Sequence, residues 1–173
     1  MDELLDIVND QDEVIGQDTF ENCHKKGFYH RASCNFVFWD DSFQELLLTQ
    51  RSSKISRPLL FDVPAGHVDT EYSYLESARE ELEEEIFYGL KMPDLELQEL
   101  FKDKFIGDDE KVFVTVFRTV CSGPFMVNPE EVKDFSFVRV SKLASDIKSH
   151  PSNYTNIFKF VFDIYYRKFH SNI

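Results

Sequence analysis

The chain has 173 residues, 42% of them hydrophobic and 29% charged, which is enough for one globular domain with its own core. Acidic residues outnumber basic ones 32 to 19, and the formal net charge of −13 argues against binding nucleic acid or an anionic membrane surface. No stretch approaches the roughly 18 apolar residues of a membrane-spanning helix, and Met1-Asp2-Glu3-Leu4-Leu5 does not resemble a signal peptide.

Two short apolar runs open the chain. Leu4–Val8 and Glu13–Ile15 flank a polar turn and predict a β-hairpin. Thr19–Lys26 predicts a short helix that stops at Gly27. We therefore expect an N-terminal hairpin and helix over about residues 4–27.

Three further strands are predicted before the middle of the chain. Ser33–Trp39 and Glu45–Gln50 flank the turn residues 40–42 and favour a second hairpin. Leu60–Val63 is a shorter apolar run that ends at residues 64–66, Pro-Ala-Gly.

The strongest helix signal runs from Ser73 to about Tyr88. Ser73 and Glu76 have the spacing of a capping box, in which hydroxyl and carboxylate satisfy two backbone donors reciprocally. Gly89 provides a stop.

The second half predicts three strands and two helices. Leu95–Ile106 and Lys111–Cys121 read as long strands, followed by a strand at Phe135–Val140. Ser141–Lys148 predicts a short helix, and Asn153–Phe169 has the apolar spacing of an amphipathic helix that closes the fold at about residues 153–170. This order predicts a single α+β domain over residues 1–173, an α/β/α sandwich with a mixed sheet.

The helix at 73–88 carries an acidic edge. At about 100° per residue, the carboxylates of Glu81, Glu84 and Glu85 fall within an arc of about 100°. The remaining positions predict an apolar stripe of Leu75, Ala78, Leu82 and Ile86 and a solvent face of Glu76, Glu80 and Glu83.

Such an edge is costly for an ordinary surface helix. Like charges at positions i and i+4, as in Glu81 and Glu85, each cost about 0.2–0.5 kcal/mol. A divalent cation would offset this repulsion, and carboxylate oxygens suit Mg²⁺ or Mn²⁺. The residues alone leave two interpretations open, a metal site and a solvated acidic face.

The surrounding sequence resembles the box of the Nudix hydrolases, G-x5-E-x7-R-E-U-x-E-E-x-G-U. With Gly66 as the first glycine, Glu81, Leu82, Glu84 and Glu85 align without a gap over a box region of about residues 66–90. The resemblance implies a Nudix fold and divalent metals held by Glu81, Glu84, Glu85 and the carbonyl of Gly66. Three positions depart from the pattern: Tyr72, Glu80 and Phe87 stand where the family has Glu, Arg and Gly.

Flanking segments resemble one branch of the family, which contains isopentenyl-diphosphate isomerase and bacterial YfcD-type proteins. Residues 6–9, 13–16 and 30–32, and then 123–125 with 130–132, carry this likeness. It implies a second metal site at His30, His67 and Glu110, while His24 lies one residue away from the expected spacing. The isomerases also need a cysteine, which takes part in protonating the substrate carbon, where this chain has Ala65. Alanine has no titratable group and cannot do this.

The resemblance therefore favours a Mg²⁺- or Mn²⁺-dependent hydrolase of a diphosphate linkage in a nucleotide-like substrate. Glu84, Glu85 and Glu131 are the candidates for activating water. Arg51, Lys54 and Arg57 are candidates for binding substrate phosphates. Two alternatives stay open, an isomerase of prenyl diphosphates and a degenerate Nudix fold that only binds a ligand.

The expected setting follows from the same features. Three cysteines without zinc or disulfide spacing indicate a reducing, cytoplasmic compartment. The expected partner is a small phosphorylated metabolite, with no nucleic acid and no membrane, bound by a monomer or homodimer.

Overall fold

The computed structural model describes residues 4–108 and 110–170. In chain order its elements are β1 (Leu4–Val8), β2 (Val14–Thr19), α1 (Phe20–Lys26), β3 (His30–Phe38), β4 (Glu45–Arg51), β5 (Phe61–Asp62), β6 (Ala65–His67), α2 (Tyr74–Glu85), β7 (Gln98–Ile106), β8 (Lys111–Val120), β9 (Val132–Arg139), α3 (Val140–Ser149), the 3-10 turn Pro151–Asn153 and α4 (Asn156–Phe169). Met1–Glu3 of the predicted N-terminus and Asp109, between the two long strands, lie outside the described residues.

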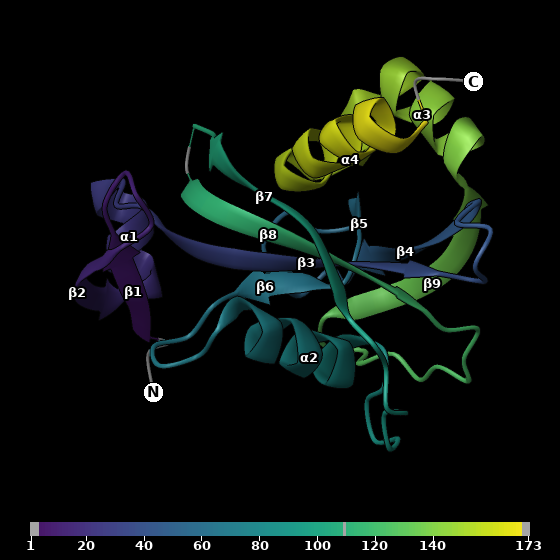
Figure 1. Ribbon diagram of the computed structural model, residues 1–173, viewed down its shortest axis with the longest axis horizontal. Helices are drawn as coiled ribbons and strands as arrows, with labels where there is room; N and C mark the ends of the chain where they lie inside the picture. The colour runs from purple at the N-terminus through teal and green to yellow at the C-terminus, as the bar shows by residue number, and fades with distance from the viewer. Residues whose placement is uncertain (1–3, 109, 171–173) are drawn as a thin grey trace.

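A seven-stranded sheet occupies the middle of the molecule. Its order is β5-β4-β3-β8-β7, with β6 paired to β3 and β9 paired to β4. Because β3 and β8 run parallel and β7 and β8 antiparallel, the sheet is mixed. Helix α2 lies on one face and α3 and α4 lie on the other (Figure 1), which confirms the predicted α/β/α sandwich.

The core follows the alternation of side chains along strand β3. Phe36 and Phe38 point to one face, where they pack against Phe158 and Tyr165 of α4. Val37, between them, belongs to the cluster on the α2 face. This period of two places a separate apolar layer on each side of the sheet.

Several predicted boundaries were wrong. Helix α2 ends at Glu85 rather than near Tyr88, with Ile86 as its C-cap. Strand β7 begins at Gln98, three residues later than predicted. The predicted hairpin of β3 and β4 is reduced to one pair, Phe38 with Leu46, because β4 takes β9 and β5 as its main partners.

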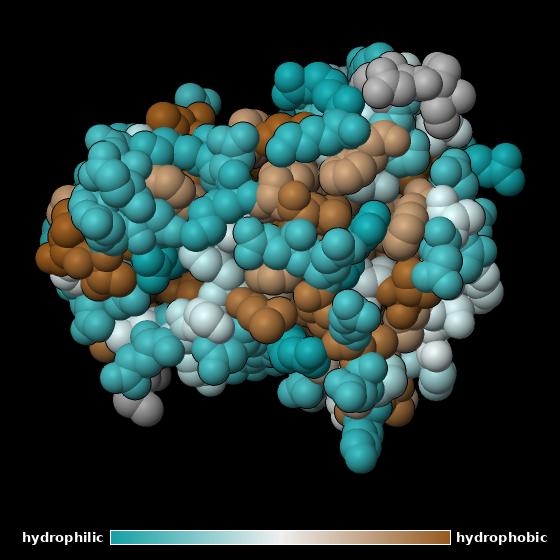
Figure 2. All heavy atoms as spheres, in the orientation of Figure 1, coloured by the Kyte–Doolittle hydropathy of each residue, from teal (hydrophilic) through white to brown (hydrophobic). Residues whose placement is uncertain are grey.

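The N-terminal segment forms a separate unit at one end of the sheet (Figure 1). Strands β1 and β2 pair as a small sheet of their own, and α1 follows directly. Thr19 caps α1, and Gly27 ends it in the left-handed conformation with φ 65°. Apolar side chains gather at this end of the surface (Figure 2), where Leu4, Val14 and Ile15 are exposed.

None of the described helices is long and apolar enough to cross a membrane.

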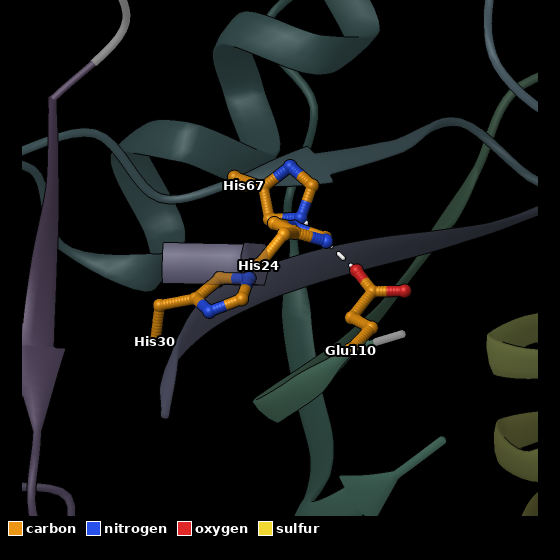
Figure 3. A group of neighbouring side chains, drawn as sticks. All are labelled: His24, His30, His67 and Glu110. Carbon is orange, nitrogen blue, oxygen red and sulfur yellow. Dashed lines mark hydrogen bonds and ion pairs between the residues drawn. The ribbon is translucent and has the colours of Figure 1, made fainter. Parts of the chain in front are cut away.

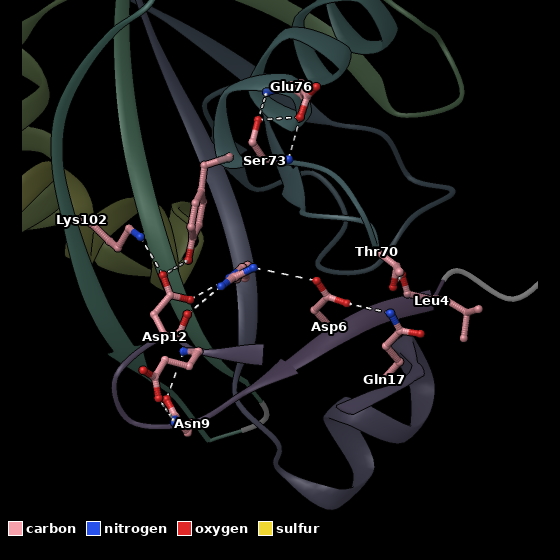
Figure 4. A network of polar contacts seen from close by, with 12 residues as sticks. Leu4, Asp6, Asn9, Asp12, Gln17, Thr70, Ser73, Glu76 and Lys102 are labelled. Carbon is pink, nitrogen blue, oxygen red and sulfur yellow. Dashed lines mark hydrogen bonds and ion pairs between the residues drawn. The ribbon is translucent and has the colours of Figure 1, made fainter. Parts of the chain in front are cut away.

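One carboxylate, Asp12, fastens the N-terminal unit to the rest of the fold (Figure 4). Its oxygens accept hydrogen bonds from Nε of Arg31 at 2.7 Å, Nζ of Lys102 at 2.6 Å and the hydroxyl of Tyr74 at 3.0 Å. These donors come from β3, β7 and α2. Burial acts to raise the pKa of Asp12, but the hydrogen bonds from Lys102 and Arg31 hold it below its usual value.

We expect Asp12→Asn to lower the free energy of unfolding by about 2 kcal/mol, because it removes the charge that Arg31 and Lys102 share and leaves the half-buried Arg31 only the more distant Asp6, at 3.8 Å. Asn tolerates the positive φ of this position, 62°, so backbone strain does not contribute. Urea denaturation would measure the change. Asp10→Asn, which removes an exposed carboxylate paired with Lys104, is the control and should change stability by less than about 0.5 kcal/mol.

Candidate functional site

Helix α2 rests closely on strand β3 through small and polar side chains. Ser77 and Ser33 are hydrogen-bonded through their hydroxyls at 3.2 Å, and the amide of Asn35 donates to the carbonyl of Ala78 at 2.9 Å. Ser77 is also 3.1 Å from the carbonyl of His67 and donates to it. The small side chains at 77 and 78 therefore bring the acidic edge of α2 beside strand β6.

A cavity of about 970 Å³ opens along this edge. Most of the predicted site residues line it: Arg51, Arg57, Gly66, His67, Glu81, Glu84, Glu85, Glu110 and Glu131. Residues that the sequence did not single out also contribute, among them Phe20, Cys34 and Asp62. The volume is large enough for a nucleotide-sized ligand.

Gly66 of β6 lies in close contact with a side chain of α2. A Cβ atom at this position would overlap with the Glu81 carboxylate, so only glycine allows the approach. The neighbouring N–H of Ala65 donates to Oε1 of Glu85 at 3.3 Å. The backbone of β6 thus lies directly against two of the three carboxylates predicted to hold metal.

The acidic edge is graded from buried to exposed. Glu85 is 7% exposed, whereas Glu84 is open to solvent. Burial, and then the charge of Glu81, raise the pKa of Glu85 well above its ordinary value, and the hydrogen bond from Ala65 only partly opposes them. A cation at this edge would remove both the repulsion and the desolvation penalty.

The predicted solvent face of α2 needs one correction. Glu80 is half-buried and lines the cavity, because the segment after β6 lies beside it. Its carboxylate accepts a hydrogen bond from the hydroxyl of Tyr72 at 3.5 Å. Two of the three residues that depart from the box pattern, Tyr72 and Glu80, therefore contact each other. Leu75, predicted to be in the apolar stripe, is 41% exposed.

Three histidines and a glutamate converge beside the cavity (Figure 3), and His24, His67 and Glu110 line it. We call His24, His30, His67 and Glu110 the histidine cluster. One potential ligand atom from each lies within 4.8 Å of the others. They come from α1, β3, β6 and the segment before β8. Sequence reasoning left His24 out because its spacing was one residue short.

The orientation of His30 suits a metal ligand. Its Nδ1 lies 3.1 Å from the carbonyl of Phe28, which can only accept, so Nδ1 carries the proton. Nε2 is then a buried lone pair, with no hydrogen-bond partner among the described residues. Burial lowers the pKa of His30 to about 4, which keeps the ring neutral. A second contact that fixes the tautomer in this way is usual for metal-binding histidines.

Glu110 supplies the negative charge of the histidine cluster. Its side chain is 1% exposed, and Oε1 lies 3.0 Å from Nε2 of His67 while Oε2 lies 2.9 Å from Nη2 of Arg57. Burial acts to raise its pKa, but the hydrogen bond with His67 and the charges of His67 and Arg57 lower it to about 2. Three imidazole nitrogens and one carboxylate oxygen form a donor set that fits Zn²⁺ or Mn²⁺.

The remaining predicted residues differ in their contacts and in whether they line the cavity. Arg51 donates to the carbonyl of Ser56 at 2.9 Å and lies 3.9 Å from Asp62, so it holds its own loop. Lys54 is not among the residues that line the cavity and pairs with the exposed Glu130. Glu131 lines the cavity, and the amide of Asn128 donates to it at 2.9 Å.

Comparison with known proteins points to one family. The model of the NUDIX domain matches residues 29–160. The chain is 30% identical over 146 residues to YfcD of Escherichia coli K12, described as an uncharacterised Nudix hydrolase, across 83% of this chain and 77% of that protein. It is 28% identical over 158 residues to isopentenyl-diphosphate Delta-isomerase of Serratia proteamaculans, across 90% of this chain and 87% of the isomerase.

The fold has a close match among solved structures. A crystal structure of a Deinococcus radiodurans protein aligns with a TM-score of 0.74, covering 92% of this chain and 97% of that one, at 21% identity.

We expect Gly66→Ala to weaken Mn²⁺ binding at the acidic edge at least about 10-fold, because the new methyl group displaces the Glu81 carboxylate. Isothermal titration calorimetry would measure the affinity. Gly16→Ala is a matched control, since a Cβ there meets only Ile7 at an ordinary 3.9 Å and should leave Mn²⁺ affinity unchanged. Equal affinities of the two variants would contradict the assignment of Gly66 and Glu81.

Proposed function

The chain belongs to the Nudix family, and on that premise we propose that it hydrolyses a diphosphate linkage in a small, nucleotide-like substrate with the help of Mg²⁺ or Mn²⁺. The observation that carries the proposal is the cavity at Gly66, where the carboxylates of Glu81, Glu84 and Glu85 border a space of nucleotide size.

The charges of the cavity make a cation necessary for this substrate. The chain carries a net charge of −13, and the acidic edge would repel a diphosphate on its own. The residues that would hold the cation are Glu81, Glu84, Glu85 and the carbonyl of Gly66. A divalent ion there would neutralise phosphate charge and make a water molecule a better nucleophile.

The reaction needs a proton acceptor. A water oxygen attacks one phosphorus, the bridging P–O bond breaks, and the leaving phosphate takes the bonding electron pair. The proton from the water passes to a carboxylate. Glu84, Glu85 and Glu131, which all line the cavity, are the candidates for this carboxylate.

Basic residues would meet the phosphates that do not react. Arg51 and Arg57 line the cavity and are the candidates, whereas Lys54, in the loop between them, does not line it. The histidine cluster would hold a second divalent ion beside the same cavity. The diphosphate would then be contacted by the basic side chains, by the ion at the histidine cluster and by the cation at the acidic edge.

A second candidate is an isomerase of prenyl diphosphates. It is favoured by the histidine cluster and by the similarity to the Serratia isomerase. Against it stands Ala65, since a methyl side chain cannot move a proton. Incubation with isopentenyl diphosphate in heavy water decides between the two: deuterium in the carbon skeleton would establish isomerisation, and its absence would leave hydrolysis.

We expect Glu84→Gln and Glu85→Gln each to lower the hydrolysis rate about 100-fold, because each amide removes both a charge and a proton acceptor. The assay is phosphate release from nucleoside di- and triphosphates, nucleotide sugars and dinucleoside polyphosphates with Mg²⁺ or Mn²⁺.

The control is Glu83→Gln, an exposed position on the same helix that does not line the cavity and should keep full activity. If both test variants hydrolyse substrate at the wild-type rate, the acidic edge is not the catalytic site. If wild type neither hydrolyses substrate nor binds Mg²⁺ or Mn²⁺ in calorimetry, the chain is a binding module with a degenerate box.

A further inference from the structure

Glu110 is held from two sides by different parts of the chain. Oε1 contacts His67, whereas Oε2 accepts a hydrogen bond from Arg57. In Figure 3 one carboxylate oxygen faces the histidines and the other points away from them. Arg57 therefore contacts Oε2, the carboxylate oxygen that does not face the histidines.

The surroundings of Glu110 make this contact important. The carboxylate is 1% exposed, and Arg57 donates a hydrogen bond to its outer oxygen at 2.9 Å. Arg57 is 30% exposed and reaches inward from the loop between β4 and β5. That loop folds back on itself where Arg51 donates to the carbonyl of Ser56, directly before Arg57. The loop is thus shaped to aim one guanidinium at one carboxylate.

We propose that Arg57 is a positioning residue for the histidine cluster, which fixes the Glu110 carboxylate so that its inner oxygen is ready for a divalent cation. The inference rests on the metal-binding role proposed for this cluster. It gives Arg57 a function other than direct contact with substrate phosphates. A planar guanidinium suits this task because its donors keep a fixed geometry.

Arg57 also sets the charge of the site. Its guanidinium lies 2.9 Å from the Glu110 carboxylate, so its positive charge balances the negative charge of that residue. A bound divalent ion would then be neutralised less by Glu110 and would attract an incoming phosphate more strongly. Glu110 without Arg57 would cancel part of the ion's charge.

The test is the affinity for Co²⁺, whose visible d–d absorption depends on its ligands and coordination geometry and so differs between the histidine cluster and the all-oxygen acidic edge. We expect Arg57→Gln to weaken Co²⁺ binding about 10-fold and to alter the absorption spectrum, because Glu110 is no longer fixed. Arg57→Lys keeps the charge and one donor and should recover part of the affinity. It also serves as the second variant if Arg57→Gln does not fold.

Two controls show whether Arg57 acts through Glu110. Lys54→Gln removes the same charge from the same loop, at a side chain paired with Glu130, and should leave Co²⁺ affinity unchanged. In a Glu110→Gln background, Arg57→Gln should cause no further loss, as expected when two residues form one unit.

The possible results are distinct. If Arg57→Gln binds Co²⁺ as wild type does, or weakens binding equally with and without Glu110, the inference about Arg57 is wrong and the metal site stands. If wild type shows no absorption of Co²⁺ bound to histidine ligands, the metal site and the inference are both wrong, while hydrolysis at the acidic edge can still be assayed separately.

Discussion

The approach of α2 to strand β6 is the contact on which the cavity depends. Ser77 and Ala78 let the helix lie against β3, and Gly66 leaves room for the Glu81 carboxylate. The same contact puts the Ala65 N–H next to Glu85. A larger side chain at Gly66 would displace the Glu81 carboxylate, and the acidic edge would lose its contact with β6.

The fold was largely predictable because its main signals are local. The capping box at Ser73, the stop at Gly27 and the alternation along β3 each follow from neighbouring residues, and the structure contains all three. The acidic edge of α2 was predictable for the same reason. Strand β6 was not, because three residues are too few to show a periodic pattern. The partners of β4 were also hidden, since β9 is distant in sequence.

The parts of the site that sequence reasoning missed depend on tertiary contacts. His24 reaches the histidine cluster because the whole N-terminal unit is docked, and spacing along the chain does not report that docking. Glu80 lines the cavity because the segment after β6 lies beside it, which a helical wheel cannot show. The contact of Arg57 with Glu110 joins two loops, and loops carry no periodic signal.

The histidine cluster draws its four members from α1, β3, β6 and the segment before β8. An ion on these side chains would therefore act as a cross-link between the N-terminal unit and the sheet, beside the polar fastening at Asp12. A ligand that binds only the folded chain stabilises it by about 2.7 kcal/mol at one hundred times its dissociation constant. The proposed second metal would then govern how long the protein survives unfolding and proteolysis, and its supply would set the lifetime of the folded chain independently of any role in turnover.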